Sequence, residues 1–168
     1  MIKNKKLASI VTGVIIGSFC VGTTQLQPVI KGLYLLIGIM LSGMTYWDLE
    51  KHVIPNKLTA TVLIMSLIRI FLNIELAIIH GITGVITFSI LYITYILSKK
   101  QLGVGDIKIL TVLSLFLGPE KILTLLFLST LLAGIFSLIG LATKKINKKT
   151  ELPFMPFIFI SYYYVILM

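Results

Sequence analysis

From Leu76 to Leu97 the sequence reads LAIIHGITGVITFSILYITYIL and contains no Asp, Glu, Lys or Arg. An apolar run of about 20 residues is the length of α-helix that crosses the hydrocarbon core of a bilayer. Similar runs recur from Leu7 to the last residue. Of the 168 residues, 57% are hydrophobic and 12% are charged, whereas soluble domains average about 25% charged residues. This composition excludes a water-soluble globular protein, a disordered chain and a nucleic-acid-binding module.

Polar breaks divide the apolar sequence into seven segments, which predict an all-α, polytopic membrane helix bundle with about six or seven transmembrane helices. The expected segments run over about Leu7–Leu26, Val29–Trp47, Leu58–Leu72, Leu76–Leu97, Ile107–Leu117, Ile122–Ala142 and Leu152–Met168. The basic start of the first segment is also typical of a signal peptide, but no clear cleavage site follows it. We therefore expect a retained helix in residues 1–28 and the main membrane domain in residues 29–168.

The lysines orient these segments in the membrane. With the N-terminus in the cytoplasm, twelve lysines fall inside and only Lys31 and Lys121 fall outside, with Arg69 near the outer end of the third segment. The inside set is Lys3, Lys5, Lys6, Lys51, Lys57, Lys99, Lys100, Lys108, Lys144, Lys145, Lys148 and Lys149. Because short cytoplasmic loops are enriched in Lys and Arg, the sequence predicts a multi-pass protein of the plasma membrane in this orientation.

Two acidic residues, Asp48 and Asp106, close the second apolar run and open the fifth. The predicted topology places both at the cytoplasmic edge of the membrane, where their side chains can meet. Two close carboxylates cannot both ionise readily, and such a pair can activate water and protonate a leaving amine, as in aspartic proteases. Taken separately, Asp48 could be a loop residue and Asp106 a helix N-cap. Gly103 and Gly105 permit irregular backbone before Asp106 and leave space for an extended peptide.

The remaining polar residues predict no metal site. Cys20 is the only cysteine, and His52 has no second ligand nearby in the sequence. His80 lies among apolar residues and is expected to be a helix-packing or interfacial residue. Arg69 is expected to extend its side chain to the outer membrane surface. The run Tyr162–Tyr164 is expected to belong to an aromatic belt at the interface between membrane and water.

Taken together, these motifs resemble the prepilin peptidase family, the membrane aspartic peptidases of the GxGD type. Three matches occur in the family's order: Asp48 with Ile54-Pro55-Asn56 downstream, Gly103-Val104-Gly105-Asp106-Ile107-Lys108, and Leu152-Pro153-Phe154-Met155-Pro156-Phe157. The resemblance covers about Val29 to Met168. Presenilin-type peptidases also carry Gly-x-Gly-Asp, but they pair it with Tyr-Asp and Pro-Ala-Leu. Here Trp47 precedes Asp48 and Pro-Ala-Leu is absent.

The resemblance implies an endopeptidase, without metal or organic cofactor, that removes the short basic leader of prepilin-like or flagellin-like proteins. It implies that Asp48 and Asp106 are catalytic and leaves open which one is the base. Pro55, Asn56, Gly103, Gly105 and Lys108 are expected to shape the site. Larger relatives add a four-Cys domain linked to N-methylation, so this chain resembles the short form. The rival interpretation is a small transporter or non-catalytic assembly component that uses the two Asp residues to bind protons or cations.

Overall fold

The chain forms a bundle of α-helices in the computed structural model, which describes residues 2–22, 27–98, 102–144 and 152–168. The described residues contain seven α-helices, one 3₁₀ turn and no β-strand, so the predicted all-α fold is confirmed. In chain order, the elements are α1 (Ile2–Gly22), α2 (Pro28–Lys51), α3 (Asn56–Leu72), η1 (Ile74–Leu76), α4 (Ala77–Leu97), α5 (Val104–Leu117), α6 (Pro119–Ala142) and α7 (Met155–Leu167).

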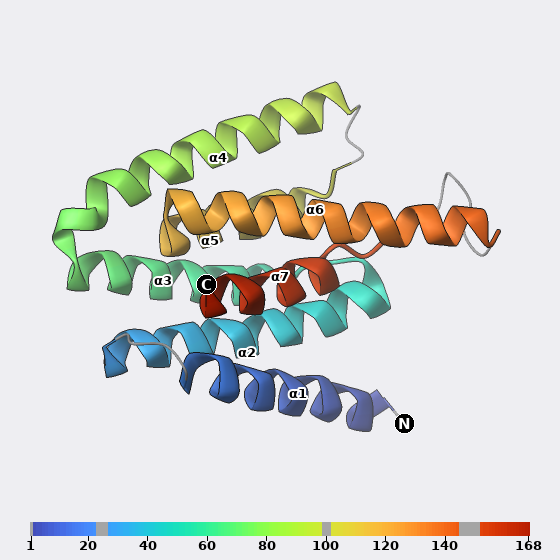
Figure 1. Cartoon of the computed structure of the whole chain (residues 1–168), viewed down its shortest axis with the longest axis horizontal. Coiled ribbons are helices and arrows are strands. Elements are labelled where there is room, and N and C mark those ends of the chain that lie inside the picture. The colour runs from blue at the N-terminus through green and yellow to red at the C-terminus, as the bar shows by residue number, and fades with distance from the viewer. Residues whose placement is uncertain (1, 23–26, 99–101, 145–151) are drawn as a thin grey trace.

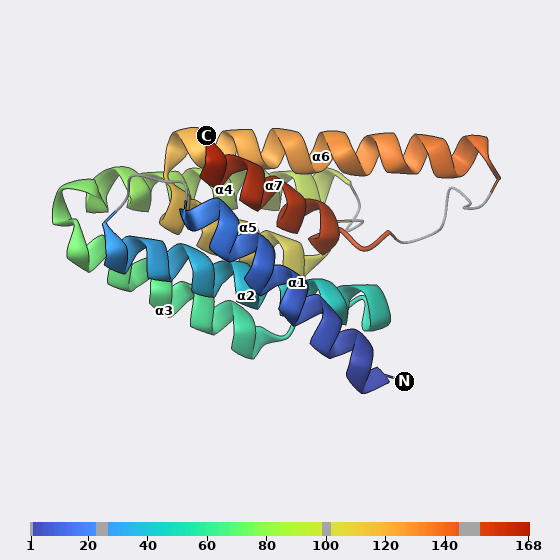
Figure 2. The same cartoon turned by 60° about the horizontal axis from the view of Figure 1, so that its bottom comes forward.

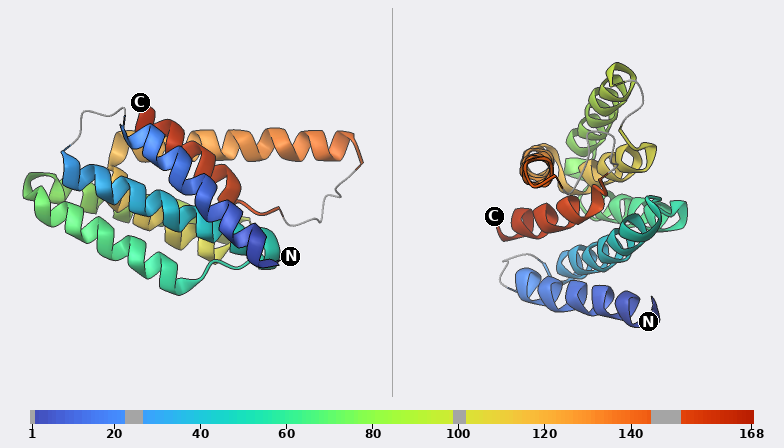
Figure 3. Two further views of the ribbon diagram at one scale, coloured as in Figure 1. Left: turned by 90° about the horizontal axis from the view of Figure 1, so that it is seen from below. Right: turned by 90° about the vertical axis from the view of Figure 1, so that its right-hand side faces the viewer.

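Successive helices run in opposite directions (Figure 1). The α2–α3 turn and the first residues of α5 and α7 therefore lie at the same end of the bundle, which we call the α2–α3 end. The η1 turn and the α5–α6 turn lie at the opposite end. Seen end on, α1 and α4 occupy opposite edges of the bundle (Figure 3). Lys99, Lys100, Lys145, Lys148 and Lys149, which support the predicted orientation, lie outside the described residues.

The outer surface identifies a membrane protein. Three stretches are long and apolar enough to cross a bilayer by length and composition, namely Pro28–Lys51, Ile74–Leu97 and Pro119–Ala142, and α7 is a shorter apolar helix. Most of α4 and α6 is not covered by other helices, and both expose large apolar side chains such as Ile78 and Phe127. Exposing this much apolar surface to water would be costly, whereas lipid solvates it.

The short helix α5 lies between α3, α4 and α6, and its last carbonyl groups receive side-chain donors. Its 14 residues extend about 21 Å. Arg69 of α3 donates a hydrogen bond to the carbonyl oxygen of Phe116, and Nδ1 of His80 of α4 lies 2.7 Å from that of Leu115. Arg69 also donates to the hydroxyl of Tyr34, at 2.9 Å. Arg69 therefore supplies a donor to the end of α5, and the expectation that it extends to the outer membrane surface stays a prediction.

The tyrosines of α7 hold the bundle together. Tyr162 and Tyr163 are buried, and only Tyr164 is exposed. The hydroxyl of Tyr163 donates to the carbonyl of Gly13 in α1, and that of Tyr162 to the carbonyl of Tyr34 in α2, each at 2.9 Å. The predicted aromatic belt is therefore wrong for Tyr162 and Tyr163. The helix α1 packs against α2 (Figure 2). The division of the chain at residue 28 stays a prediction.

Candidate active site

Asp48 lies in the last turn of α2. The helix runs one turn past the predicted end at Trp47, to Lys51, and stops at His52, which adopts a left-handed conformation with φ of 51°. The carboxyl of Asp48 is buried, with 6% of the residue exposed, so the interpretation of Asp48 as a loop residue is wrong. Its Oδ2 accepts a hydrogen bond of 3.0 Å from the backbone N–H of Met155.

This hydrogen bond shows how the segment Leu152-Pro153-Phe154-Met155-Pro156-Phe157 contributes to the site. Met155 is the first residue of α7, and the first N–H groups of a helix have no partner within the helix. They also attract negative charge, so the start of α7 stabilises the Asp48 carboxylate. The sequence analysis missed Met155, because a backbone donor leaves no mark in residue type. The available signal was Pro156, since proline in a first helical turn marks the start of a helix.

Asp106 lies in the first turn of α5. The N-cap residue is Gly103, so the interpretation of Asp106 as the N-cap is wrong. A Cβ atom on Gly103 would lie 2.6 Å from Oδ2 of Asp106, so a side chain there would displace the Asp106 carboxyl group. Gly105 is helical rather than irregular as predicted. A Cβ atom there would lie 3.1 Å from the side chain of Ile54, so this glycine lets α5 approach the α2–α3 turn.

Asp106 lies just before the apolar stretch 107–117. The negative charge of Asp48 acts on its carboxyl group. Burial raises the pKa of Asp106, and the negative charge of Asp48 raises it further, to about 7. Oδ1 of Asp106 is buried and has no hydrogen-bond partner among the described residues. The fold therefore brings within electrostatic reach two carboxyl groups that are far apart in sequence. Such a pair holds one proton near neutral pH.

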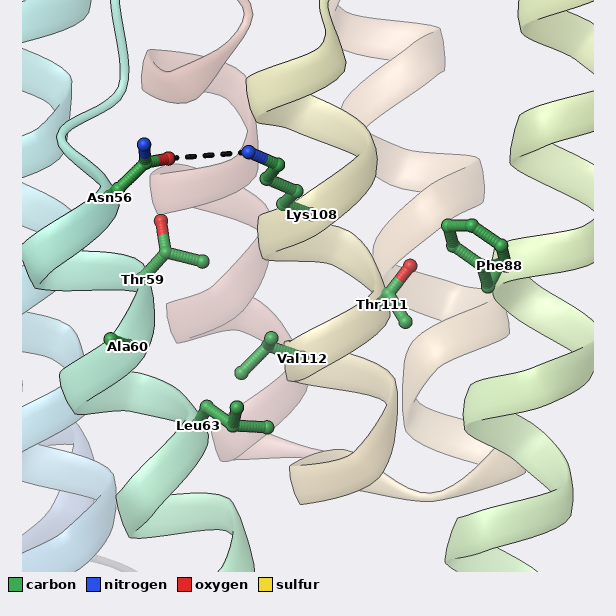
Figure 4. A pocket seen from close by; sticks show the side chains of 8 residues that line it. All are labelled: Asn56, Thr59, Ala60, Leu63, Phe88, Lys108, Thr111 and Val112. Atoms are coloured by element: carbon green, nitrogen blue, oxygen red, sulfur yellow. Dashed lines mark hydrogen bonds between the residues drawn. The ribbon is translucent and has the colours of Figure 1, made fainter.

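Lys108 of α5 and Asn56 of α3 join the first turns of these two helices. Nζ of Lys108 donates a 3.3 Å hydrogen bond to Oδ1 of Asn56, as Figure 4 shows. Pro55 is the N-cap residue of α3 in an extended conformation, and Asn56 is its first residue. Pro55 and Asn56 therefore set where α3 begins, and the hydrogen bond from Lys108 holds this first turn against α5. Within the described residues, no group of three or more His, Cys, Asp and Glu side chains could hold a metal ion.

The arrangement defines a class: a helical membrane protein with two interacting carboxyl groups at one end of its bundle. The comparison with known families is more specific. The chain belongs to the type IV leader peptidase family, whose model matches residues 34–138. The matched region includes Asp48 and Asp106 and ends before the segment that starts α7.

Several curated relatives are named prepilin leader peptidase/N-methyltransferase. The relative from Aeromonas hydrophila is 31% identical over 134 residues, which cover 76% of this chain and 46% of the relative. That from Aeromonas salmonicida strain A449 is 28% identical over 133 residues, with the same coverages. That from Dichelobacter nodosus is 28% identical over 142 residues, covering 80% and 48%. The chain thus spans about half the length of these relatives. No solved structure matches it.

Proposed function

We propose that this chain is a membrane-embedded aspartic endopeptidase that removes the short basic leader of prepilin-like proteins. The observation that carries the proposal is the interaction between the buried carboxyl group of Asp48 and the half-buried one of Asp106, in which the charge of Asp48 helps to raise the pKa of Asp106. The names of the relatives supply the class of substrate. A carboxyl pair with different proton affinities is the arrangement that acid–base hydrolysis of a peptide bond requires.

The surroundings of the two carboxyl groups suggest how they divide the reaction. Asp48 accepts the N–H of Met155, and in this proposal it takes a proton from a water molecule. The water oxygen attacks the carbonyl carbon of the substrate, while protonated Asp106 donates to the carbonyl oxygen. When the tetrahedral intermediate collapses, the C–N bond breaks and the amine leaves with the proton held by Asp48. The remaining hydroxyl proton returns to Asp106.

The helix directions support a cytoplasmic location for this chemistry. Alternating helices place the N-terminus, the α2–α3 turn and the start of α5 at one end (Figure 1). Lys51, Lys57 and Lys108 lie at that end, whereas Lys121 lies at the other. Because positive loop charge stays in the cytoplasm, we infer a multi-pass protein of the plasma membrane with its carboxyl pair on the cytoplasmic side. A basic leader would remain on that side for the same reason.

The direct test is cleavage by the carboxamide variants. Asp48→Asn and Asp106→Asn should each lower kcat by at least about 100-fold, because removal of a general acid or base has effects of about 10² to 10⁴. Each variant should still accumulate in membranes. The matched control is Glu50→Gln, an exposed acid in the same helical turn as Asp48. Near-normal cleavage by either Asp variant removes that residue from the mechanism. A chain that binds protons or cations but cleaves no leader supports the transporter interpretation instead.

A further inference from the structure

Tyr163 of α7 places its hydroxyl between α1 and α2. The side chain is buried, and the hydroxyl donates a hydrogen bond of 2.9 Å to the carbonyl of Gly13 in α1. A Cβ atom added to Gly17 of α1 would lie 2.9 Å from the hydroxyl oxygen, and one added to Gly38 of α2 would overlap it. The hydroxyl therefore fills a notch that two facing glycines leave open.

A second hydroxyl ties α7 directly to α2. Tyr162 donates to the carbonyl of Tyr34, at 2.9 Å. Because Tyr162 and Tyr163 are consecutive, their side chains leave the helix about 100° apart. One directional bond would let α7 turn about its axis, whereas bonds to two different helices fix both its rotation and its position along the axis. Apolar contacts such as that of Phe157 with Phe136 of α6 are non-directional and leave this freedom.

The start of the same helix carries the donor to Asp48. The N–H of Met155 lies 3.0 Å from Oδ2 of Asp48. Met155 and Tyr163 belong to one unbroken helix and are separated by about two turns, or about 12 Å. A rotation or slide of α7 at Tyr163 therefore moves the N–H of Met155 relative to the carboxyl group. Since a hydrogen bond weakens steeply as its angle departs from linear, a small displacement is enough to loosen it.

The helices α1 and α7 both lie outside residues 34–138, which match the family model. They contact each other, and both pack against α2 (Figure 2). The notch around the Tyr163 hydroxyl is thus built in part from a helix that the matched region does not contain.

We propose that Tyr163 is a positioning residue, which keeps α7 in the place from which the N–H of Met155 reaches Asp48. The helix α1 thereby supports the active site without contributing a group to it. The inference rests on the proposed function where it concerns activity, because there it takes Asp48 as the base. The position of the Met155 N–H can be measured without any cleavage.

Amide hydrogen exchange at Met155 is the first test. NMR of the full chain with isotopically labelled methionine, in detergent micelles, follows each methionine amide separately. In Tyr163→Phe, exchange at Met155 should be at least about tenfold faster relative to Met65 of α3, because a hydrogen bond to a charged group is worth a factor of about ten or more. A general loosening of the bundle would speed both amides alike. Tyr164→Phe, at the neighbouring exposed tyrosine, is the matched control and should leave the ratio unchanged.

A substitution in α1 tests the same contact from the other side. Gly17→Ala should also speed exchange at Met155, because the added Cβ atom presses on the Tyr163 hydroxyl. Once that hydroxyl is removed, the nearest ring atoms lie 3.4 and 3.6 Å from the Cβ atom, which are ordinary contact distances. The double variant should therefore be no worse than Tyr163→Phe alone. The control is Gly22→Ala, where an added Cβ meets no atom within 4 Å. Unchanged exchange at Met155 in Tyr163→Phe, or effects that simply add in the double variant, overturns the proposal.

Cleavage provides the functional readout. Tyr163→Phe should lower kcat about tenfold, as for a group at the reacting centre displaced by less than about 1 Å, with KM nearly unchanged, because the base acts in the reaction step rather than in binding. Tyr164→Phe should change neither constant. A normal kcat together with fast exchange at Met155 refutes the positioning role. Failure of the parent chain to cleave any leader contradicts the proposed function instead, and the exchange measurement then still decides whether Tyr163 holds the Met155 N–H in place.

Discussion

Replacing Gly105 with alanine should separate the stability of the protein from its activity. Gly105 lies in the first turn of α5, one residue before Asp106. An added Cβ atom would lie 3.1 Å from Cβ and Cδ1 of Ile54 and 3.2 Å from its Cγ1. These contacts are tighter than ordinary van der Waals distances, so either α5 or the α2–α3 turn must move by a few tenths of an ångström.

Two opposing effects determine the change in stability. Overpacking of this kind costs about 1–3 kcal/mol. Replacing a helical glycine with alanine returns up to about 1 kcal/mol. The free energy of unfolding of Gly105→Ala should therefore fall by about 0–2 kcal/mol. Activity should fall more, since a displacement of about 1 Å in a catalytic group can cost about 100-fold. We expect a loss of about tenfold in kcat for the smaller movement here.

The assay is leader cleavage in detergent or membranes, with thermal unfolding measured on the same preparations. The control is Gly134→Ala in α6, where an added Cβ meets no atom within 4 Å and activity should not change. Adding Ile54→Ala to Gly105→Ala removes Cγ1 and Cδ1 and should restore part of the lost kcat. Full activity in Gly105→Ala, or no recovery in the double variant, would refute the argument that this close approach positions Asp106.

Three further outcomes follow from the structure. The pKa of Asp106 is raised to about 7, and the proton on this group is needed, so kcat/KM should fall about tenfold per pH unit as pH rises above 7; a flat profile to pH 9 would contradict this. Arg69→Met should lower the free energy of unfolding by about 1–3 kcal/mol in a denaturation assay, because the carbonyl of Phe116 loses its donor; an unchanged stability would show that this bond is dispensable. A cysteine at Lys51 should react with an impermeant reagent only from the cytoplasm, and one at Lys121 only from outside, and the reverse pattern would invert the topology.

The sequence was sufficient to predict the helices, because long apolar runs are a local signal, and it singled out two acidic residues whose catalytic role stays a prediction. A bilayer demands long apolar runs, so breaks such as Gly118 and Pro119 mark the ends of helices without any tertiary information. Asp48 and Asp106 stand out because a charge at the end of an apolar run is costly. The helix boundaries were less accurate, since Asp48–Lys51 is polar in sequence and yet continues α2.

The sequence could not show contacts that depend on tertiary packing. The neighbours of Arg69 in the sequence are apolar, and for this reason its side chain was expected to extend to the outer membrane surface. Its actual partner is a carbonyl near the end of α5, 47 residues away, and nothing in the sequence near Arg69 identifies it. The buried position of Tyr163 likewise depends on Gly13, 150 residues away. Met155 is a further case, because its contribution to the site is a backbone N–H that every residue except proline possesses.

The location of the shared proton follows from comparing two energies at the carboxyl pair. Asp106 lies at the N-terminus of α5, where the helix dipole favours an anion by about 0.3–1 kcal/mol. Burial and the charge of Asp48 nevertheless raise its pKa from 3.8 to about 7, a difference worth about 4 kcal/mol. Asp48 lies at the C-terminus of α2, where the dipole disfavours an anion, but the N–H of Met155 supplies a charge-assisted hydrogen bond. The larger effect therefore favours a protonated Asp106, and we propose that Asp48, which accepts the N–H of Met155 at the start of α7, acts as the base.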